Sequence, residues 1–268
     1  MPRPYPGRVF ALSRRSLLMG TLAAAGAGVA AACSAAAKSG TAASSPSTRR
    51  PTAPPSATRL SPTPEPTGPA IEVVNGPWTR QEVALTFHAS GDPALGRALL
   101  SAAEAGGAKL TIFVVGSWLD QNPSMAQRIV SGGHELGNHT YTHPNLRALS
   151  GAALEDEVTR ARDVLRRLTG SGGDYFRPSQ MDRATAPVLA AAGEAGYRTS
   201  VAYDVDPLDY QDPGSAAVRD RTLAAVRPGS IVSMHLGHQG TVDAMPEILA
   251  GLKQRGLQPV TVGQLLRA

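Results

Sequence analysis

Two histidines stand four residues apart in the stretch GHELGNHTYTHP, which spans residues 133–144. His139 and His143 bracket the end of a short apolar run and the loop after it, so both imidazoles can face one metal ion. Such a pair needs a third ligand from elsewhere in the chain, and two polar loop histidines would show the same spacing. The pair therefore predicts a metal site only in combination with other residues.

Ionisable side chains also stand at the ends of most of the other short apolar runs. His88 follows the first run, Arg177 lies in the fourth, Asp204 ends the fifth and His235 ends the sixth. Residues that are distant in sequence can share one active site if the fold brings these ends together. The sequence contains seven such runs: Val83–Phe87, Leu110–Val115, Glu135–His139, Tyr175–Pro178, Thr199–Asp204, Ser230–His235 and Pro259–Val262.

Helical patterns separate these runs. Apolar residues recur at helical spacing from Leu154 to Leu168, with Ser150 as the expected N-cap, and Asn122-Pro123 opens another predicted helix. Alternation of strand and helix predicts an α/β fold with a mostly parallel sheet, and about seven units favour a closed or nearly closed barrel. In such barrels the chemistry lies at the carboxyl ends of the strands, where the polar ends of these runs would meet.

Five stretches together resemble the motifs of the polysaccharide deacetylases, the NodB-homology family of carbohydrate esterases (family 4). Their order and spacing match that family over residues 71–268. The stretches are VALTFHASGDP (83–93), GGHELGNHTYTHPNL (132–146), YFRPSQ (175–180), YDVDPLDY (203–210) and IVSMHLG (231–237). The resemblance implies a distorted (β/α)7 barrel, which agrees with the seven apolar runs.

The resemblance also implies roles for individual residues. His139 and His143 would bind one divalent metal ion, expected to be zinc, with cobalt, nickel or manganese as alternatives. His235 would protonate the leaving amine, and Asp209 would keep that imidazole protonated for its acid role. Arg177 corresponds to the family's arginine, which orients the catalytic base.

Three further residues are expected to contact the substrate. Tyr210 stands where the family usually has Trp, Leu236 follows the acid histidine, and Asp206 lies in the same acidic and aromatic stretch as Asp209. The sequence is equally compatible with Tyr210 as a packing residue and with Asp206 as the cap of a loop or helix.

The first motif departs from the family pattern. The family has Thr-Phe-Asp-Asp-Gly-Pro, in which the first aspartate is the base and the second binds the metal. This chain has His88 and Ala89 at these two positions. Because alanine cannot bind a metal, the identity of the third ligand and of the base is open at this point.

Three explanations compete. In the first, His88 replaces the missing ligand and completes a three-histidine site, while Asp92 or Asp206 acts as base. In the second, His88 is the base, Arg177 keeps it neutral, and a shifted acid such as Asp92 joins the histidine pair at the metal. In the third, metal and catalysis are lost, and the chain is a carbohydrate-binding lipoprotein of the cell envelope.

The charge of the chain separates into two parts. The 268 residues contain 26 Lys and Arg against 21 Asp and Glu, a formal net charge of +5. Residues 1–70 carry a net charge of +7 and residues 71–268 a net charge of −2, so we expect no nucleic-acid partner for the latter. The only cysteine, Cys33, lies before the near-neutral part, which excludes a disulfide framework or a cysteine-rich zinc site there.

The N-terminal segment predicts export. Arg14-Arg15 precedes a mildly apolar stretch rich in Ala and Gly, so residues 1–32 resemble a twin-arginine signal peptide. The small residues before Cys33 resemble a lipoprotein processing site, and a lipid anchor in the membrane is expected only if Cys33 is acylated. Residues 33–75 are rich in Ala, Ser, Thr and Pro and predict a disordered linker.

Together these observations predict an exported protein of the cell envelope, lipid-anchored or secreted, with its catalytic domain over residues 76–268. The expected activity is a metal-dependent hydrolysis of N-acetyl groups, or of O-acetyl groups, on an amino-sugar polysaccharide. Peptidoglycan is the first substrate to consider, because a tether would hold the domain near the cell wall. The alternative is the catalytically degenerate sugar-binding lipoprotein.

Overall fold

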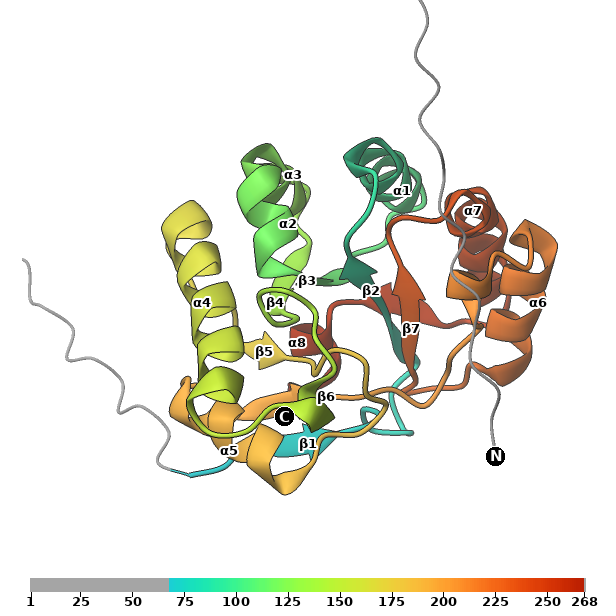
Figure 1. The fold of residues 1–268 in the computed structure, drawn as a ribbon. Coiled ribbons are helices and arrows are strands. Elements are labelled where there is room, and N and C mark those ends of the chain that lie inside the picture. Colours follow the sequence, from blue (N-terminus) through green and yellow to red (C-terminus); the bar gives the residue numbers. More distant parts are fainter. Residues whose placement is uncertain (1–67, 268) are drawn as a thin grey trace, which may run out of the picture. The chain divides into compact units, whose positions relative to one another are not determined.

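The computed structural model describes residues 68–267, and these form a parallel sheet with helices packed around it (Figure 1). The strands are β1 Ile71–Val73, β2 Glu82–Ala89, β3 Thr111–Val114, β4 Glu135–Asn138, β5 Tyr175–Phe176, β6 Thr199–Val201, β7 Ile231–His235 and β8 Gln258–Val260. The α-helices are α1 Pro93–Ala105, α2 Gly116–Gln121, α3 Pro123–Ser131, α4 Ala152–Thr169, α5 Ala186–Glu194, α6 Ser215–Ala225, α7 Gln239–Gln254 and α8 Val262–Leu265. Two short 3-10 helices are η1 Leu146–Ala148 and η2 Asp209–Gln211.

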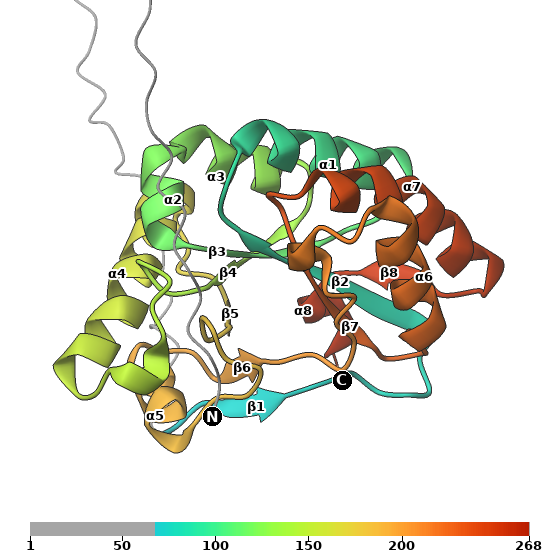
Figure 2. The same ribbon diagram turned by 45° about the vertical axis from the view of Figure 1, so that its right-hand side comes forward.

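The sheet curls into a nearly closed barrel. Its strand order is β1-β6-β5-β4-β3-β2-β7, and β8 pairs with the first half of β2. All the strand pairs are parallel, and a single bridge from Val205 to Val232 joins the segment after β6 to β7. Figure 2 shows the strands in the middle with the longer helices outside them. The predicted distorted (β/α)7 barrel is confirmed.

Each of the seven predicted apolar runs overlaps one of the strands β2 to β8. The eighth strand, β1, was not expected, because Ile71–Val73 fall inside the predicted linker of residues 33–75. This boundary is wrong: β1 pairs with β6, and its backbone hydrogen bonds hold it in the sheet. The predicted signal peptide, Cys33 and the linker up to residue 67 lie outside the described residues.

The predicted helices are present with small changes at their ends. Helix α3 begins at Pro123 with Asn122 at the N-cap, as the Asn-Pro pair indicates. Helix α4 buries Leu154, Val158 and Leu165, but its N-cap is Gly151 and not Ser150. Gly151 has a positive φ of 52°, which favours glycine, so the helix begins one residue later than the hydroxyl at 150 suggests.

The strands have apolar side chains on both faces, which pack in two separate layers. Leu85, Phe87 and Ala89 of β2 point into the large core between sheet and helices, whereas Ala84 packs inside the barrel. Because side chains alternate along a strand, His88 faces the interior with Ala84. Helix α8 closes the amino end of the barrel through Val262 and Leu265, so only the carboxyl end is left for a site.

Leu85 provides a test of this core. The side chain is fully buried, so Leu85→Ala is expected to lower the free energy of unfolding by about 2–5 kcal/mol. Urea unfolding followed by circular dichroism measures the change. Val130→Ala on α3, where the valine is 43% exposed, is the matched control and should shift stability by about 0.5 kcal/mol or less. Equal losses for the two variants would contradict the assignment of Leu85 to the core.

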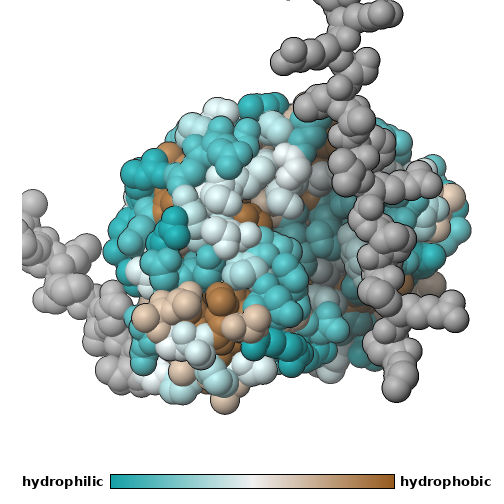
Figure 3. All heavy atoms as spheres, in the orientation of Figure 1, coloured by the Kyte–Doolittle hydropathy of each residue, from teal (hydrophilic) through white to brown (hydrophobic). Residues whose placement is uncertain are grey.

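One face of the domain is largely hydrophilic. The face in Figure 3 shows apolar residues only in small patches among polar ones. Among residues 68–267, no helix has the length and apolar character that crossing a bilayer requires.

Candidate active site

A cavity of about 320 Å³ opens at the carboxyl ends of the strands. The register of β2 and β7 places His88 directly beside His235, and His139 and Arg177 follow the last residues of β4 and β5. The predicted meeting of the polar run ends is therefore present for His88, His139, Arg177 and His235. It is not present for Asp204, whose carboxylate accepts hydrogen bonds from the Ser230 hydroxyl and the Ile231 N–H at the start of β7. The cavity is lined by His88, His139, His143, Pro178, Gln180, Met181, Asp182, Tyr203, Asp206, Tyr210, Ser233 and His235.

Four side chains form one hydrogen-bonded array. Arg177 carries only donors, so its Nη1 donates to Nε2 of His88 over 3.3 Å. The remaining ring proton of His88 is then on Nδ1, which donates to Nε2 of His235 over 3.0 Å. Nδ1 of His235 in turn donates to Oδ1 of Asp209 over 2.7 Å. The hydrogen bonds thus fix the tautomers of both imidazoles.

Asp209 is held from three sides. It is 1% exposed, and its Oδ2 accepts hydrogen bonds from the backbone N–H of His235 at 2.8 Å and from Oγ1 of Thr241 at 2.7 Å. With the bond to the His235 ring, the carboxylate has three donors, which suits an ionised acceptor. Asp209 therefore fixes the orientation of the His235 ring.

Arg177 is a buried guanidinium held mainly by carbonyl groups. It is 1% exposed, donates to the carbonyl oxygens of Val201 and Ala202, and packs over the Phe113 ring at 4.2 Å. None of its hydrogen-bond partners within residues 68–267 is a carboxylate. Burial lowers the pKa of Arg177 to about 9, and burial also lowers the pKa of His88 well below its usual range, so this imidazole is neutral.

His139 and His143 have the geometry of a ligand pair. His139 is 1% exposed, and its Nδ1 donates to the Arg177 carbonyl oxygen over 2.9 Å. Its Nε2 is buried and has no hydrogen-bond partner among the described residues. The His143 ring lies 4.9 Å away, between centroids. Metal-binding histidines usually anchor one ring nitrogen in this way and offer the other to the ion, so the pair fits a divalent cation.

The structure does not support His88 as the third protein ligand of the metal. The rings of His88 and His139 stack with centroids 4.2 Å apart and an angle of 18°. An imidazole binds a metal along the lone pair in its ring plane, so two nearly parallel stacked rings cannot share one ion. Both nitrogens of His88 are also engaged, by Arg177 and His235.

Asp92 is not a ligand in this arrangement either. It is exposed, and its Oδ1 accepts the N–H of Ala94 as the N-cap of α1. Ala89, at the family's ligand position, packs in the core. No cluster of three or more His, Cys, Asp or Glu suited to a metal occurs between residues 68 and 267. Among the described residues, His139 and His143 are the two that would hold a cation.

The predicted substrate contacts are partly at the cavity. Tyr210 is 47% exposed and its ring lies 5.4 Å from that of His235, and Asp206 also lines the cavity. Burial raises the pKa of Asp206, and its Oδ1 accepts the N–H of Leu208. The predicted substrate contact of Leu236 is wrong. Its side chain is 1% exposed and packs in the core, because successive side chains alternate and it points to the opposite face of the sheet from His235.

The cavity also has members that were not predicted individually. Gln180, Tyr203 and Ser233 lie inside three of the stretches that resemble family motifs, and this was the available signal for them. Met181 and Asp182 line the cavity as well. Their side chains reach it because of loop conformation and strand register, which a sequence pattern does not specify.

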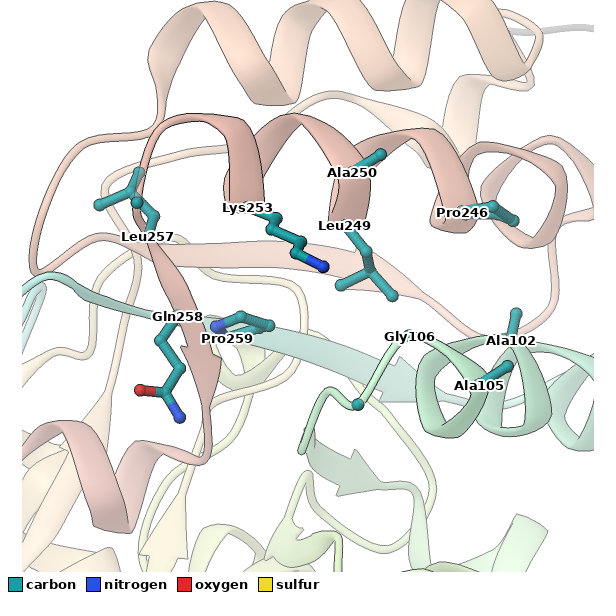
Figure 4. Close-up of a pocket in the computed structure, with 12 residues that line it drawn as sticks. Ala102, Ala105, Gly106, Pro246, Leu249, Ala250, Lys253, Leu257, Gln258 and Pro259 are labelled. Atoms are coloured by element: carbon teal, nitrogen blue, oxygen red, sulfur yellow. The ribbon is translucent and has the colours of Figure 1, made fainter.

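A second, larger cavity of about 670 Å³ lies between α1, α7 and β8, toward the amino ends of the strands (Figure 4). Its lining is mostly small and apolar, and Lys253 is its only ionisable residue. None of the predicted site residues lines it. The chemistry is therefore at the carboxyl end.

Comparison with known proteins shows which family the chain resembles over most of its length. The family model for polysaccharide deacetylases matches residues 75–200. A peptidoglycan-N-acetylglucosamine deacetylase of Bacillus cereus is 30% identical over 197 residues, which cover 72% of this chain and 71% of the relative. A chitooligosaccharide deacetylase of a Bradyrhizobium strain is 32% identical over 169 residues, or 58% of this chain and 77% of the relative.

Solved structures give the same result. The crystal structure of a peptidoglycan N-acetylglucosamine deacetylase superposes with a TM-score of 0.69 at 29% identity, covering 73% of this chain and 92% of that one. A pseudoenzyme of the CE4 family from Bacillus anthracis superposes with a TM-score of 0.68 at 26% identity, covering 74% and 69%. A mutant of a CE4 family pseudoenzyme with restored enzymatic activity reaches 0.69 at 27% identity, covering 74% and 71%.

Proposed function

Because the chain belongs to the polysaccharide deacetylase family, we propose that it is a metal-dependent hydrolase that removes N-acetyl groups from an amino-sugar polysaccharide. The observation that carries this proposal is the buried, unpartnered Nε2 of His139 beside His143 and the His88–His235–Asp209 array. Both features open into the same cavity. The catalytic domain begins at β1, a few residues before the boundary at residue 76.

In this proposal His139 and His143 hold one divalent ion, with zinc first and cobalt, nickel or manganese as alternatives. When bound, such an ion polarises the amide carbonyl and acidifies a water molecule. The Arg177 carbonyl keeps the His139 proton on Nδ1, so its Nε2 is always available as a ligand. Imidazole nitrogen is a ligand that zinc commonly takes.

The other residues handle protons. The stacking on His139 does not support the role of ligand for His88. As the base, His88 would accept a proton at Nε2 in place of its bond from Arg177 and pass its Nδ1 proton to Nε2 of His235. Nε2 of His235 accepts the His88 N–H and would give the proton that it receives there to the leaving amine, and the carboxylate of Asp209 stabilises the imidazolium while this proton is held. Arg177 fixes the ring of His88. Hydrolysis then yields acetate and the free amine.

The substrate is proposed to be peptidoglycan or another N-acetylated glycan. The similar proteins named above act, by their names, on peptidoglycan and on chitooligosaccharides. Tyr210 and Asp206 offer an aromatic face and a carboxylate at the cavity for a sugar ring and its hydroxyls. O-acetyl groups are the second class of bond to test.

An envelope location accords with these relatives. We propose export through the signal peptide at residues 1–32 and a tether that ends at β1. Acylation of Cys33 would anchor the protein in the membrane, and cleavage without acylation would release it.

One observation favours the second candidate function, a non-catalytic sugar-binding protein. Ala89 packs in the core where the family has a ligand, and similar folds include CE4 pseudoenzymes. A sugar-binding protein of this kind needs no metal in the cavity.

Removal of metal distinguishes the two candidates. The full chain purified without chelator is expected to carry about one equivalent of zinc or another divalent ion. Because the ion activates the nucleophile, chelation should lower acetate release from N-acetylated oligosaccharides by about 100-fold or more, and zinc or cobalt should restore it. Metal analysis and an acetate assay make the measurement. Substrate binding without metal and without acetate release would support the sugar-binding candidate instead.

A further inference from the structure

Glu157 on α4 is a buried carboxylate that faces the loop between His139 and His143. It is 7% exposed, and its described hydrogen bonds all go to this loop. Oε2 accepts the backbone N–H groups of Tyr141 at 2.9 Å and Thr142 at 2.8 Å, and Oε1 accepts the Thr142 hydroxyl at 2.6 Å. Three donors on one buried carboxylate make a strong, directional attachment.

The loop needs such an attachment because its backbone is strained. Thr140 has a φ of 66° and His143 a φ of 60°, and both are non-glycine residues in the left-handed region. Thr140 is β-branched, for which this conformation is especially unfavourable. Such residues persist only where the surrounding structure holds them in place. The two strained positions flank the amides that Glu157 binds.

The start of the loop is attached to the same helix. Asn138 accepts the N–H of Thr140 at 2.8 Å through Oδ1, and its Nδ2 donates to the Val158 carbonyl oxygen at 2.8 Å. The guanidinium of Arg160 packs over the Tyr141 ring at 3.8 Å. Neighbouring residues of α4 therefore contact the loop, and the residue just before it, at successive points.

From this geometry we propose that Glu157 is a positioning residue: it holds the loop 139–143 in the one conformation that presents both imidazoles to the same cation. Glu157 itself does not touch the cation or the substrate. The proposal rests on the proposed function insofar as the histidine pair is taken to bind a metal.

The test uses cobalt as the probe on the full chain. Glu157→Ala removes three acceptors and is expected to weaken cobalt binding by about 10- to 100-fold, with a changed visible spectrum of the bound ion. Glu157→Gln keeps an oxygen for the two amides, and its NH2 can donate to the Thr142 hydroxyl, so it should rescue most of the affinity. Glu155→Ala, on the same helix and exposed, is the matched control and should bind as the unaltered chain does.

Two results would overturn the proposal. One is a cobalt affinity of Glu157→Ala equal to that of the unaltered chain, and the other is an equal loss in Glu157→Gln. If Glu157→Ala does not fold, Thr142→Val removes the hydroxyl donor alone and should weaken cobalt binding by about threefold, and no change would count against Glu157.

Hydrogen exchange separates this proposal from the proposed function. In metal-free protein the amides of Tyr141 and Thr142 should exchange about 10-fold or more faster in Glu157→Ala than in the unaltered chain. If the unaltered chain bound no cobalt, the metal-dependent function would fail, while faster exchange at these amides would still support the role of Glu157 in shaping the loop. Unchanged exchange would refute that role.

Discussion

His139→Ala is expected to abolish both metal binding and acetate release. The substitution removes the buried Nε2 that has no hydrogen-bond partner among residues 68–267, and it leaves His143 as the only imidazole of the pair. Since loss of a residue that merely supports a ligand costs about 10- to 100-fold in affinity, loss of the ligand itself should cost at least about 100-fold. Metal content after purification and acetate release from N-acetylated oligosaccharides are the two measurements.

His134→Ala is the matched control for this prediction. His134 immediately precedes β4. Its ring accepts the N–H of Leu110 and bonds to Glu104, and it does not line the cavity. The control should lose stability and keep its metal. Acetate release that survived in His139→Ala would refute the metal mechanism.

His88→Ala is expected to separate metal binding from catalysis. The ring of His88 stacks on His139 and bonds to Arg177 and His235, so its removal leaves the ligand pair in place. The variant should retain its metal and lose about 10²- to 10⁴-fold in acetate release, the usual contribution of an acid or base group. Metal analysis and steady-state kinetics on the same preparation test both halves.

His238→Ala is the control: it removes a histidine that lies close to His235 but has no role in the proposed mechanism. Its ring lies 5.8 Å from that of His235, and Nδ1 bonds to Asp212. Less than about a 10-fold loss of activity is expected for this variant. Loss of metal from His88→Ala would instead restore the explanation in which His88 is a ligand.

The barrel could be predicted because its signals are local. Each strand is a short apolar run, and the helices between them repeat at helical spacing, as α3 and α4 show. The convergence of His88, His139 and His235 then follows from topology, since the carboxyl ends of parallel strands meet at one end of the barrel.

Two errors could have been avoided from the same rules. Leu236 follows His235 on a ladder with period two, so one of them must face the core. Asp92 precedes Pro93, the pattern of an N-cap followed by proline at the first helical position, and capping is the use that the structure makes of it.

The partners of His88 and Glu157 could not be predicted. His88 meets His235 because β2 and β7 pair in one particular register, which depends on the whole sheet. Glu157 is one of several acids on α4, and its burial depends on how the helix packs against the histidine loop. His134 is similar: it is buried against Glu104, although its place between glycine and glutamate suggests a surface loop.

The way Arg177 is held has a consequence for how this site can change over evolutionary time. Its anchors to Val201 and Ala202 are backbone carbonyls, and its packing partner Phe113 belongs to the barrel interior, so most of its attachment does not involve residue 88. A substitution at position 88 is therefore expected to leave Arg177 in place, so the residue there can change without loss of the buried arginine beside it.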